Sequence, residues 1–321
     1  VYMSALENGL QPNSLILDAP FVLDQGKSLG KWKPENYGKK FYGPSTLRKG
    51  IEYSRNLMTV RIAENLGLKK ILKLSKDLKI YDDIPELLSV SLGSAETTLL
   101  DITSAYTSFV NGGKKTSPVL IDRIQDRRGK TIYNSDKREC FGCDRFSESS
   151  INIPKIKDNY ERVFSEETAY QMTSILEGVI KRGTGKKLRD LKVPLAGKTG
   201  TTNNNYDAWF IGYSSNLVVG VYIGFDNPKS LGRYETGSKA ALPIFKNFIK
   251  EALYKEEFKS FNIPNSIYFA PINYDTGKEE LFNNPKAIIE AFKLKDINNL
   301  KNNNLDTIKN YDKLIKFRQF Y

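Results

Sequence analysis

Three strand-like segments follow one another in the second half of the chain, and they constrain its fold more than any other feature. The segments are Pro194–Thr201, Ala208–Tyr213 and Leu217–Phe225, each rich in apolar, β-branched or aromatic residues. Short polar turns at 203–206 and 214–216 connect them. The sequence therefore predicts three sequential antiparallel strands.

Helical patterns precede and follow these strands. Apolar residues recur at helical spacing from Thr46 to Gly67, where the glycine is a stop signal. Residues 14–50 lack such periodicity and are expected to form an ordered loop region. Further helices are expected near the start of the chain and at Lys69–Leu78, Thr97–Val110, Ser165–Ile180 and Ala241–Tyr254, and a β-hairpin at 118–134. This order predicts an α+β fold, an antiparallel sheet with helices on one of its sides.

The chain contains no histidine in its 321 residues, and this absence excludes several kinds of chemistry. Ser-His-Asp and Cys-His catalysis, His-ligated zinc and imidazole general bases cannot come from it. An acid–base catalyst in this chain must be Lys, Asp, Glu, Tyr or Cys. We expect no metal and no other cofactor.

Charge and hydropathy narrow the range of partners. The 49 Lys and Arg against 37 Asp and Glu give a net charge of +12, but no block of five or six like charges stands out. Without a nucleic-acid motif, we expect no nucleic-acid partner. No apolar run approaches the roughly 18–20 residues that span a bilayer.

Two short motifs are candidates for chemistry. Ser54-Arg55-Asn56 lies within the expected helix, and Lys198-Thr199-Gly200-Thr201 lies on the first expected strand. Alone, each is weak, because an isolated Ser54 is usually a solvated hydroxyl and an isolated Lys198 a solvated strand-end lysine. In this order, about 140 positions apart, they match two of the three signature elements of penicillin-recognising serine acyltransferases.

Flanking segments extend this resemblance from Val1 to about residue 255, with a weaker match at Pro264 to Gly277. They include Trp32-Lys-Pro-Glu-Asn-Tyr37, Thr46-Leu-Arg48, Ser91-Leu-Gly-Ser94, Asn111-Gly-Gly113, Arg182-Gly-Thr-Gly185 and Asp207-Ala-Trp-Phe210. In this order the chain resembles the transpeptidase domain of class A penicillin-binding proteins, the bifunctional peptidoglycan synthases. The resemblance implies the penicillin-binding/serine β-lactamase-like transpeptidase fold.

The resemblance also implies roles for the motif residues in peptidoglycan D,D-transpeptidation. Ser54 would relay a proton, Asn56 would hold a catalytic lysine and the substrate amide, and Lys198 would supply positive potential. Thr199 and Thr201 would offer hydroxyls to a substrate carboxylate. Gly200 would let the substrate approach the strand closely, and the N–H of Thr201 would stabilise an oxyanion.

One element of the family pattern is absent at its expected place. The nucleophile and base of the family lie in a Ser-x-x-Lys motif, and by resemblance Val1 follows that motif by only a few residues. We therefore expect an N-terminally truncated domain whose catalytic Ser and Lys are missing from this chain. The pattern Ser28-Leu29-Gly30-Lys31 occurs by chance, since Gly30 and the following residues disfavour a helix.

Cys140 and Cys143 form a single Cys-x-x-Cys, too few ligands for a four-ligand zinc site. The resemblance implies a periplasmic location, where a local disulfide is expected, with free surface thiols as the alternative.

The resemblance divides the chain into a transpeptidase domain at 1–260 and a C-terminal extension at 261–321, rich in Asn and Lys and expected to be poorly ordered. It implies peptidoglycan stem peptides, β-lactam antibiotics and other cell-wall synthesis proteins as partners, and a location on the periplasmic face of the bacterial inner membrane, with an anchor outside this chain. The alternative is an inactive remnant that only binds peptidoglycan or partner proteins. A hydrolytic relative fits the flanking segments less well.

Overall fold

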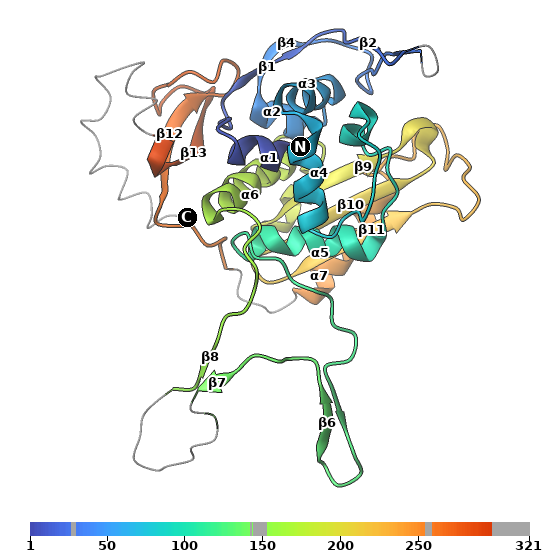
Figure 1. The fold of residues 1–321 in the computed structure, drawn as a ribbon. Coiled ribbons are helices and arrows are strands. Elements are labelled where there is room, and N and C mark those ends of the chain that lie inside the picture. Colours follow the sequence, from blue (N-terminus) through green and yellow to red (C-terminus); the bar gives the residue numbers. More distant parts are fainter. Residues whose placement is uncertain (27–29, 142, 144–152, 254–258, 297–321) are drawn as a thin grey trace.

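The computed structural model describes residues 1–26, 30–141, 143, 153–253 and 259–296 (Figure 1). Its largest sheet has three antiparallel strands in the order β11-β10-β9. They are β9 (Ala196–Thr201), β10 (Ala208–Tyr213) and β11 (Val218–Ile223). The register runs from Ala208↔Thr201 to Tyr213↔Ala196. The predicted strands are confirmed, and in the described part of the chain β9 is an edge of the sheet.

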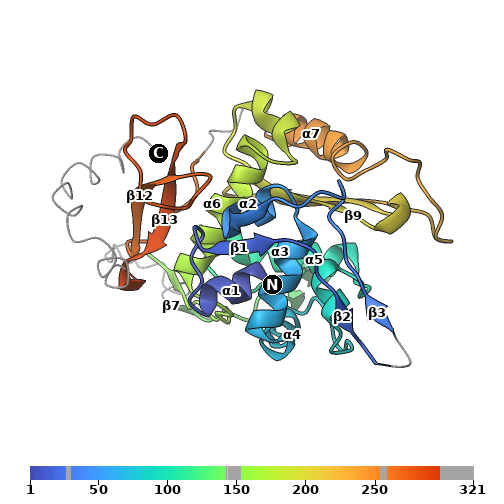
Figure 2. The ribbon, with the colours of Figure 1, turned by 90° about the horizontal axis from the view of Figure 1, so that it is seen from above.

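Helices cover both faces of this sheet (Figure 2). On one face, the ring of Phe210 lies 4.7 Å from that of Phe245 in α7 (Ala241–Ala252). On the other, Tyr213 contacts Tyr106 of α5 (Leu99–Val110) and Thr173 of α6 (Glu166–Lys181). The expectation of helices on one side was wrong, because five of the six residues of β10 are buried and side chains on both faces must be shielded from water.

Short helices and strands make up the first third of the chain, and its first two helices pack against α6. In chain order the helices and strands are α1 (Tyr2–Glu7), β1 (Leu15–Asp18), β2 (Leu23–Asp24), β3 (Lys31–Trp32), β4 (Gly43–Thr46), α2 (Leu47–Glu52), α3 (Asn56–Leu66), α4 (Leu68–Asp77) and the 3-10 helix η1 (Leu88–Leu92). Strand β1 pairs with β4 and β2 with β3, in a stretch expected to be loop. Strands of two to four residues are too short to show an apolar period.

A second hairpin, made of β12 (Ile267–Asn273) and β13 (Ala287–Lys293), packs on α6. The side-chain amide of Gln171 in α6 donates to the carbonyl of Ala291 over 3.0 Å. The expectation of a poorly ordered extension at 261–321 was therefore wrong for this hairpin, which the 3-10 turn η4 (Leu294–Asp296) follows. The remainder of that extension, 297–321, lies outside the described residues.

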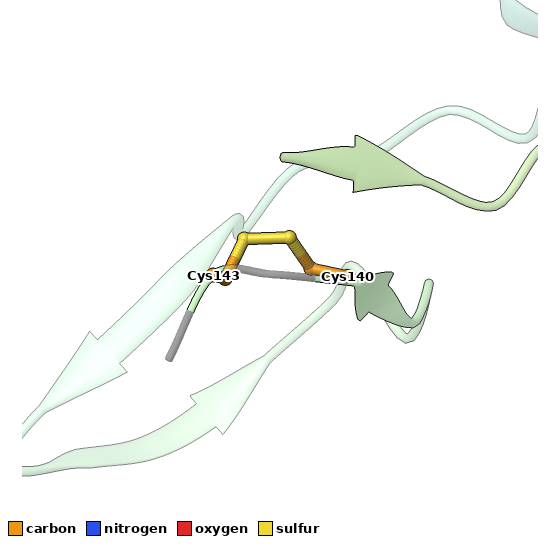
Figure 3. The surroundings of a disulfide bond; sticks show 2 residues. All are labelled: Cys140 and Cys143. Atoms are coloured by element: carbon orange, nitrogen blue, oxygen red, sulfur yellow. A yellow bond between two sulfur atoms is a disulfide. The ribbon is translucent and has the colours of Figure 1, made fainter. Parts of the chain in front are cut away.

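Residues 118–141 and 153–160 form an arm that projects from the body (Figure 1). The predicted hairpin at 118–134 is present as β5 (Arg123–Gln125) and β6 (Thr131–Asn134), and β7 (Cys140–Phe141) pairs with β8 (Lys155–Ile156). Cys140 and Cys143 form the expected disulfide (Figure 3). None of the helices in the described ranges combines the length and apolar composition needed to cross a membrane.

Candidate active site

Ser54 lies in a break between two helices, whereas we expected one continuous helix. Helix α2 ends at Glu52 and α3 begins at Asn56. The N–H of Ser54 donates to the carbonyl of Ile51 over 3.1 Å, which closes the turn. Ser54 has a φ of 54°, a left-handed conformation that costs a non-glycine residue roughly 1–2 kcal/mol. The expectation failed because the apolar repeat continues on both sides of the break.

Lys198, on β9, meets the hydroxyl of Ser54 across this break. Its Nζ donates to Ser54 Oγ and to the carbonyl of Thr199, each over 2.8 Å. Burial of the amine lowers the pKa of Lys198 from 10.5 to about 8. The fold thus joins two motifs 144 residues apart and holds there an amine that exchanges its proton near neutral pH.

The two threonines of the second motif have different surroundings. Thr199 Oγ1 lies 2.8 Å from Thr184 Oγ1, in the loop that follows α6. Thr201 Oγ1 accepts a hydrogen bond from the N–H of Gly237 over 3.0 Å. The Thr201 hydroxyl can therefore still donate its own hydrogen.

The outer edge of β9 presents backbone groups to its surroundings. The N–H of Thr202 donates to the carbonyl of Asp207, on the β10 side. Because N–H groups alternate along a strand, the N–H of Thr201 points away from β10. A Cβ on Gly200 would lie 3.0 Å from Cβ of Trp209, so packing within the sheet also favours glycine there.

The side-chain amide of Asn56 has a partner other than Ser54 or Lys198. Its side-chain amide donates to the carbonyl of Glu35 over 2.8 Å, in the loop before β4. In the described part of the chain Asn56 forms no hydrogen bond with Ser54 or Lys198. The structure therefore joins Ser54, Lys198 and Thr199 by hydrogen bonds, and it joins Asn56 to the carbonyl of Glu35.

Ser28, whose Ser-x-x-Lys pattern we attributed to chance, lies outside the described residues. Lys31 of the same pattern is the first residue of β3 and pairs with Asp24. The lysine of this pattern is thus on a strand and not on a helix.

A model of the family described as "Penicillin binding protein transpeptidase domain" matches residues 1–250. The chain belongs to this transpeptidase family. The expected fold, with its mixed helices and antiparallel sheets, is confirmed by the solved structures that resemble it.

Relatives of this transpeptidase domain are named penicillin-binding protein 1A. The Rickettsia typhi protein is 44% identical over 316 residues, which are 97% of this chain and 39% of that protein. The Pseudomonas aeruginosa protein is 35% identical over 92% of this chain and 40% of its own length. The chain therefore spans about two fifths of the length of these relatives.

Solved structures agree at the level of the fold. Penicillin-binding protein 1A from Haemophilus influenzae has a TM-score of 0.77 and 28% identity, over 91% of this chain and 46% of that one. PonA1 from Mycobacterium tuberculosis, solved in complex with penicillin V, has a TM-score of 0.66 and 19% identity, over 88% of this chain and 73% of its own.

Two residues near the Ser54–Lys198 contact were not among the predicted site residues. Thr184, which belongs to the flanking segment 182–185, contacts Thr199. Glu52 is fully buried, and its backbone carbonyl accepts from the N–H of Thr184 over 3.1 Å. The matching Arg182-Gly-Thr-Gly185 segment pointed to Thr184, whereas the position of Glu52 two residues before Ser54 was the sole hint for Glu52.

Proposed function

We propose that this chain provides the proton-relay and substrate-binding part of a peptidoglycan D,D-transpeptidase that cross-links stem peptides through a serine acyl-enzyme. The contact between Lys198 Nζ and Ser54 Oγ at 2.8 Å carries this proposal. It joins a hydroxyl that can accept and donate a proton to an amine whose pKa is about 8.

In the proposed reaction, the nucleophilic serine and its lysine base come from a part of the longer protein outside this chain. The serine attacks the carbonyl of the penultimate D-Ala, the C–N bond to the terminal D-Ala breaks, and that amine leaves with a proton. An amine of a neighbouring peptide then attacks the ester, loses a proton and releases the serine. Ser54 passes protons between the lysine base and the amines.

Lys198 and Asn56 support these steps in different ways. The positive charge of Lys198 favours deprotonation of its neighbours and attracts a substrate carboxylate. Asn56 would hold the catalytic lysine and the substrate amide, for which its amide must exchange the carbonyl of Glu35 for these partners.

Strand β9 is the proposed binding site of the peptide. An extended peptide can add to its outer edge, with Gly200 allowing close approach. The hydroxyls of Thr199 and Thr201 would bind the substrate carboxylate, and the outward N–H of Thr201 would stabilise the oxyanion.

We further propose that the longer protein also carries a glycosyltransferase domain and acts on the periplasmic face of the bacterial inner membrane, to which a segment outside this chain anchors it. β-Lactam antibiotics would acylate the same serine, and other cell-wall synthesis proteins would be its partners. The relatives named penicillin-binding protein 1A support this extension.

Intact-mass analysis after incubation with benzylpenicillin, followed by peptide mapping, tests the proposal. The protein as the cell makes it should gain one adduct per molecule, on a serine outside this chain, and the 321-residue chain alone should gain none. An adduct on Ser28 or Ser54 would refute the proposed nucleophile. No adduct on the natural protein would favour the inactive alternative.

A further inference from the structure

A buried network of charges connects the C-terminal hairpin with the Ser54 turn. Arg48 of α2 donates through Nε and Nη2 to the carboxylate of Glu290 on β13, the first of these bonds over 2.5 Å. Arg48 Nη1 also donates to Glu52 Oε1 over 3.2 Å. All three side chains are at most 2% exposed. The last residue of α2 is thereby tied to a strand more than 200 positions away.

Glu52 has two further donors besides Arg48. Arg182 donates through Nη2 to Oε1 over 2.6 Å and through Nε to Oε2 over 3.1 Å, and Tyr274 OH donates to Oε2 over 2.5 Å. Burial opposes ionisation of Glu52, but the hydrogen bonds from Arg182 and the charge of Arg48 outweigh it, so its pKa lies below the ordinary value. Glu52 is thus an ionised carboxylate held from three sides.

The surface of α6 and the loop after it accommodate Glu52 closely. A Cβ on Gly178 would lie 1.8 Å from Glu52 Oε1, and a Cβ on Gly183 would lie 2.1 Å from the Glu52 carbonyl oxygen. The absence of a side chain at Gly178 leaves space for the carboxylate of Glu52, and its absence at Gly183 leaves space for the Glu52 carbonyl. This close packing restrains both the side chain and the backbone of Glu52.

From Glu52 the structure leads to both halves of the site. Its carbonyl accepts from the N–H of Thr184, whose hydroxyl contacts Thr199 of β9. Two residues further along the chain, Ser54 accepts from Lys198 of the same strand. Glu52 thus holds Thr184 through its own carbonyl and lies two residues before Ser54, and these two residues both contact β9.

We propose that Glu52 is a positioning residue that holds the Ser54 turn and the 183–185 loop in register with β9. The value of this positioning for catalysis rests on the proposed transpeptidase activity. The positions of the Ser54 turn, the 183–185 loop and β9 can be tested in this chain alone. The hairpin β12–β13 contributes through Glu290 and Tyr274, which restrain Arg48 and Glu52.

The test is an NMR titration of lysine side chains in the 321-residue chain, with the Lys198 signal assigned by its loss in Lys198→Arg. In Glu52→Ala the Ser54 turn loosens and water reaches the amine, so the pKa of Lys198 should rise by about one unit or more, a tenfold change in proton affinity. If Glu52 acted only through its negative charge, its loss would lower the pKa of Lys198. A rise in this pKa therefore indicates that Glu52 positions the turn.

Two variants serve as controls. Glu52→Gln keeps the shape and, with its amide oxygen in the place of Oε1, the hydrogen bonds from Arg48 and from Arg182 Nη2, and it should leave the pKa of Lys198 near that of the unmodified chain. Glu64→Ala removes an exposed negative charge from α3, outside this network, and the pKa of Lys198 should change by less than about 0.3 units. An unchanged pKa of Lys198 in folded Glu52→Ala would overturn the proposal.

Tyr274→Phe decides the matter if Glu52→Ala does not fold, because it removes one hydrogen bond and no charge. A rise in the pKa of Lys198 would support positioning, and no change would refute it. Benzylpenicillin acylation of the natural protein is measured in parallel. If that protein is not acylated, the proposed function is wrong. The pKa of Lys198 in the Glu52 variants still tests whether Glu52 positions the Ser54 turn.

Discussion

The backbone of Ser54 adopts a conformation that serine seldom takes, with a φ of 54°. Strained residues of this kind persist where the surroundings hold them, and they often mark functional sites. Here the break directs the hydroxyl to Lys198. The strain arises because the backbone at Ser54 leaves the helical conformation between α2 and α3.

A comparison of Ser54→Gly with Ser54→Ala measures this strain. Both variants lose the hydroxyl, but only glycine adopts a positive φ without steric cost. Ser54→Gly should therefore be more stable than Ser54→Ala by about 1 kcal/mol in urea unfolding. Equal stability of the two variants would show that the turn is not strained.

The Lys198 amine makes stability depend on pH. Its folded pKa of about 8 lies below the ordinary 10.5, so between these values the unfolded chain binds more protons and stability rises with pH. Lys198→Met lacks this group and should be more stable than the unmodified chain at pH 7, by at most about 3 kcal/mol. Urea unfolding from pH 7 to 10.5 should show that advantage disappear. An advantage independent of pH would contradict the lowered pKa.

At the scale of elements, the side chain of Glu52 packs directly against helix α6 at Gly178. Alanine is favoured over glycine inside a helix by about 1 kcal/mol, yet Gly178 lies within the C-terminal part of α6. Glu52 Oε1 occupies the position that its Cβ would need. Packing around Glu52 therefore overrides helix propensity at this position.

Gly178→Ala should destabilise the chain by about 2 kcal/mol, because the clash with Glu52 exceeds the gain in propensity. In a Glu52→Ala background the clash with that carboxylate is absent, and the same substitution should become neutral or stabilising. Thermal and urea unfolding of the four proteins form a double-mutant cycle. If Gly178→Ala has the same effect in both backgrounds, Glu52 does not occupy that space.

Elements with a local signal could be predicted from the sequence, and elements held by distant partners could not. Strand β10 was predicted with its bounds, because apolar residues and polar turns define it locally. Strand β13 was missed because it carries Glu290 and Lys293, which weaken its apolar pattern. Arg48 binds Glu290, and Thr168 and the Leu6 carbonyl bind Lys293, all more than 100 positions away.

In the site too, the features that depend on residues distant in the sequence could not be predicted. The two motifs indicated that Ser54 and Lys198 belong together, and the contact between them agrees with that expectation. The role of Glu52 could not be inferred, because it depends on two glycines and two arginines that come together only in the folded chain. The roles of Asn56, Gly200 and Thr201 remain predictions.

At the scale of the whole molecule, buried clusters hold the body together, and the arm stands apart from them. One cluster joins α1, α2, α5, α6 and the sheet, and another fills the space between the sheet and α7. Strands β5 and β6 of the arm consist of exposed residues. The hairpin β12–β13 packs on α6, while the domain boundary near residue 260 remains a prediction.

Because the arm adds little to these clusters, its disulfide should matter locally. Replacing both Cys140 and Cys143 by serine should lower the Tm of the main unfolding transition by less than about 2 °C. Calorimetry checks this, with the chain treated with a reductant as a second comparison. A loss of 5 °C or more, about 2–3 kcal/mol for a chain of this size, would mean that the arm supports the body.

The central claim is that Ser54 and Lys198 act together in a serine acyltransferase site, and the rate of acylation of the natural protein by a fluorescent penicillin tests it most directly. Ser54→Ala and Lys198→Ala should each slow acylation about 100-fold or more, since each removes a proton-transfer group. Lys181→Ala, at an exposed lysine on α6, is the matched control and should acylate at the rate of the unmodified protein. Rates in Ser54→Ala and Lys198→Ala equal to that of the unmodified protein would contradict the account.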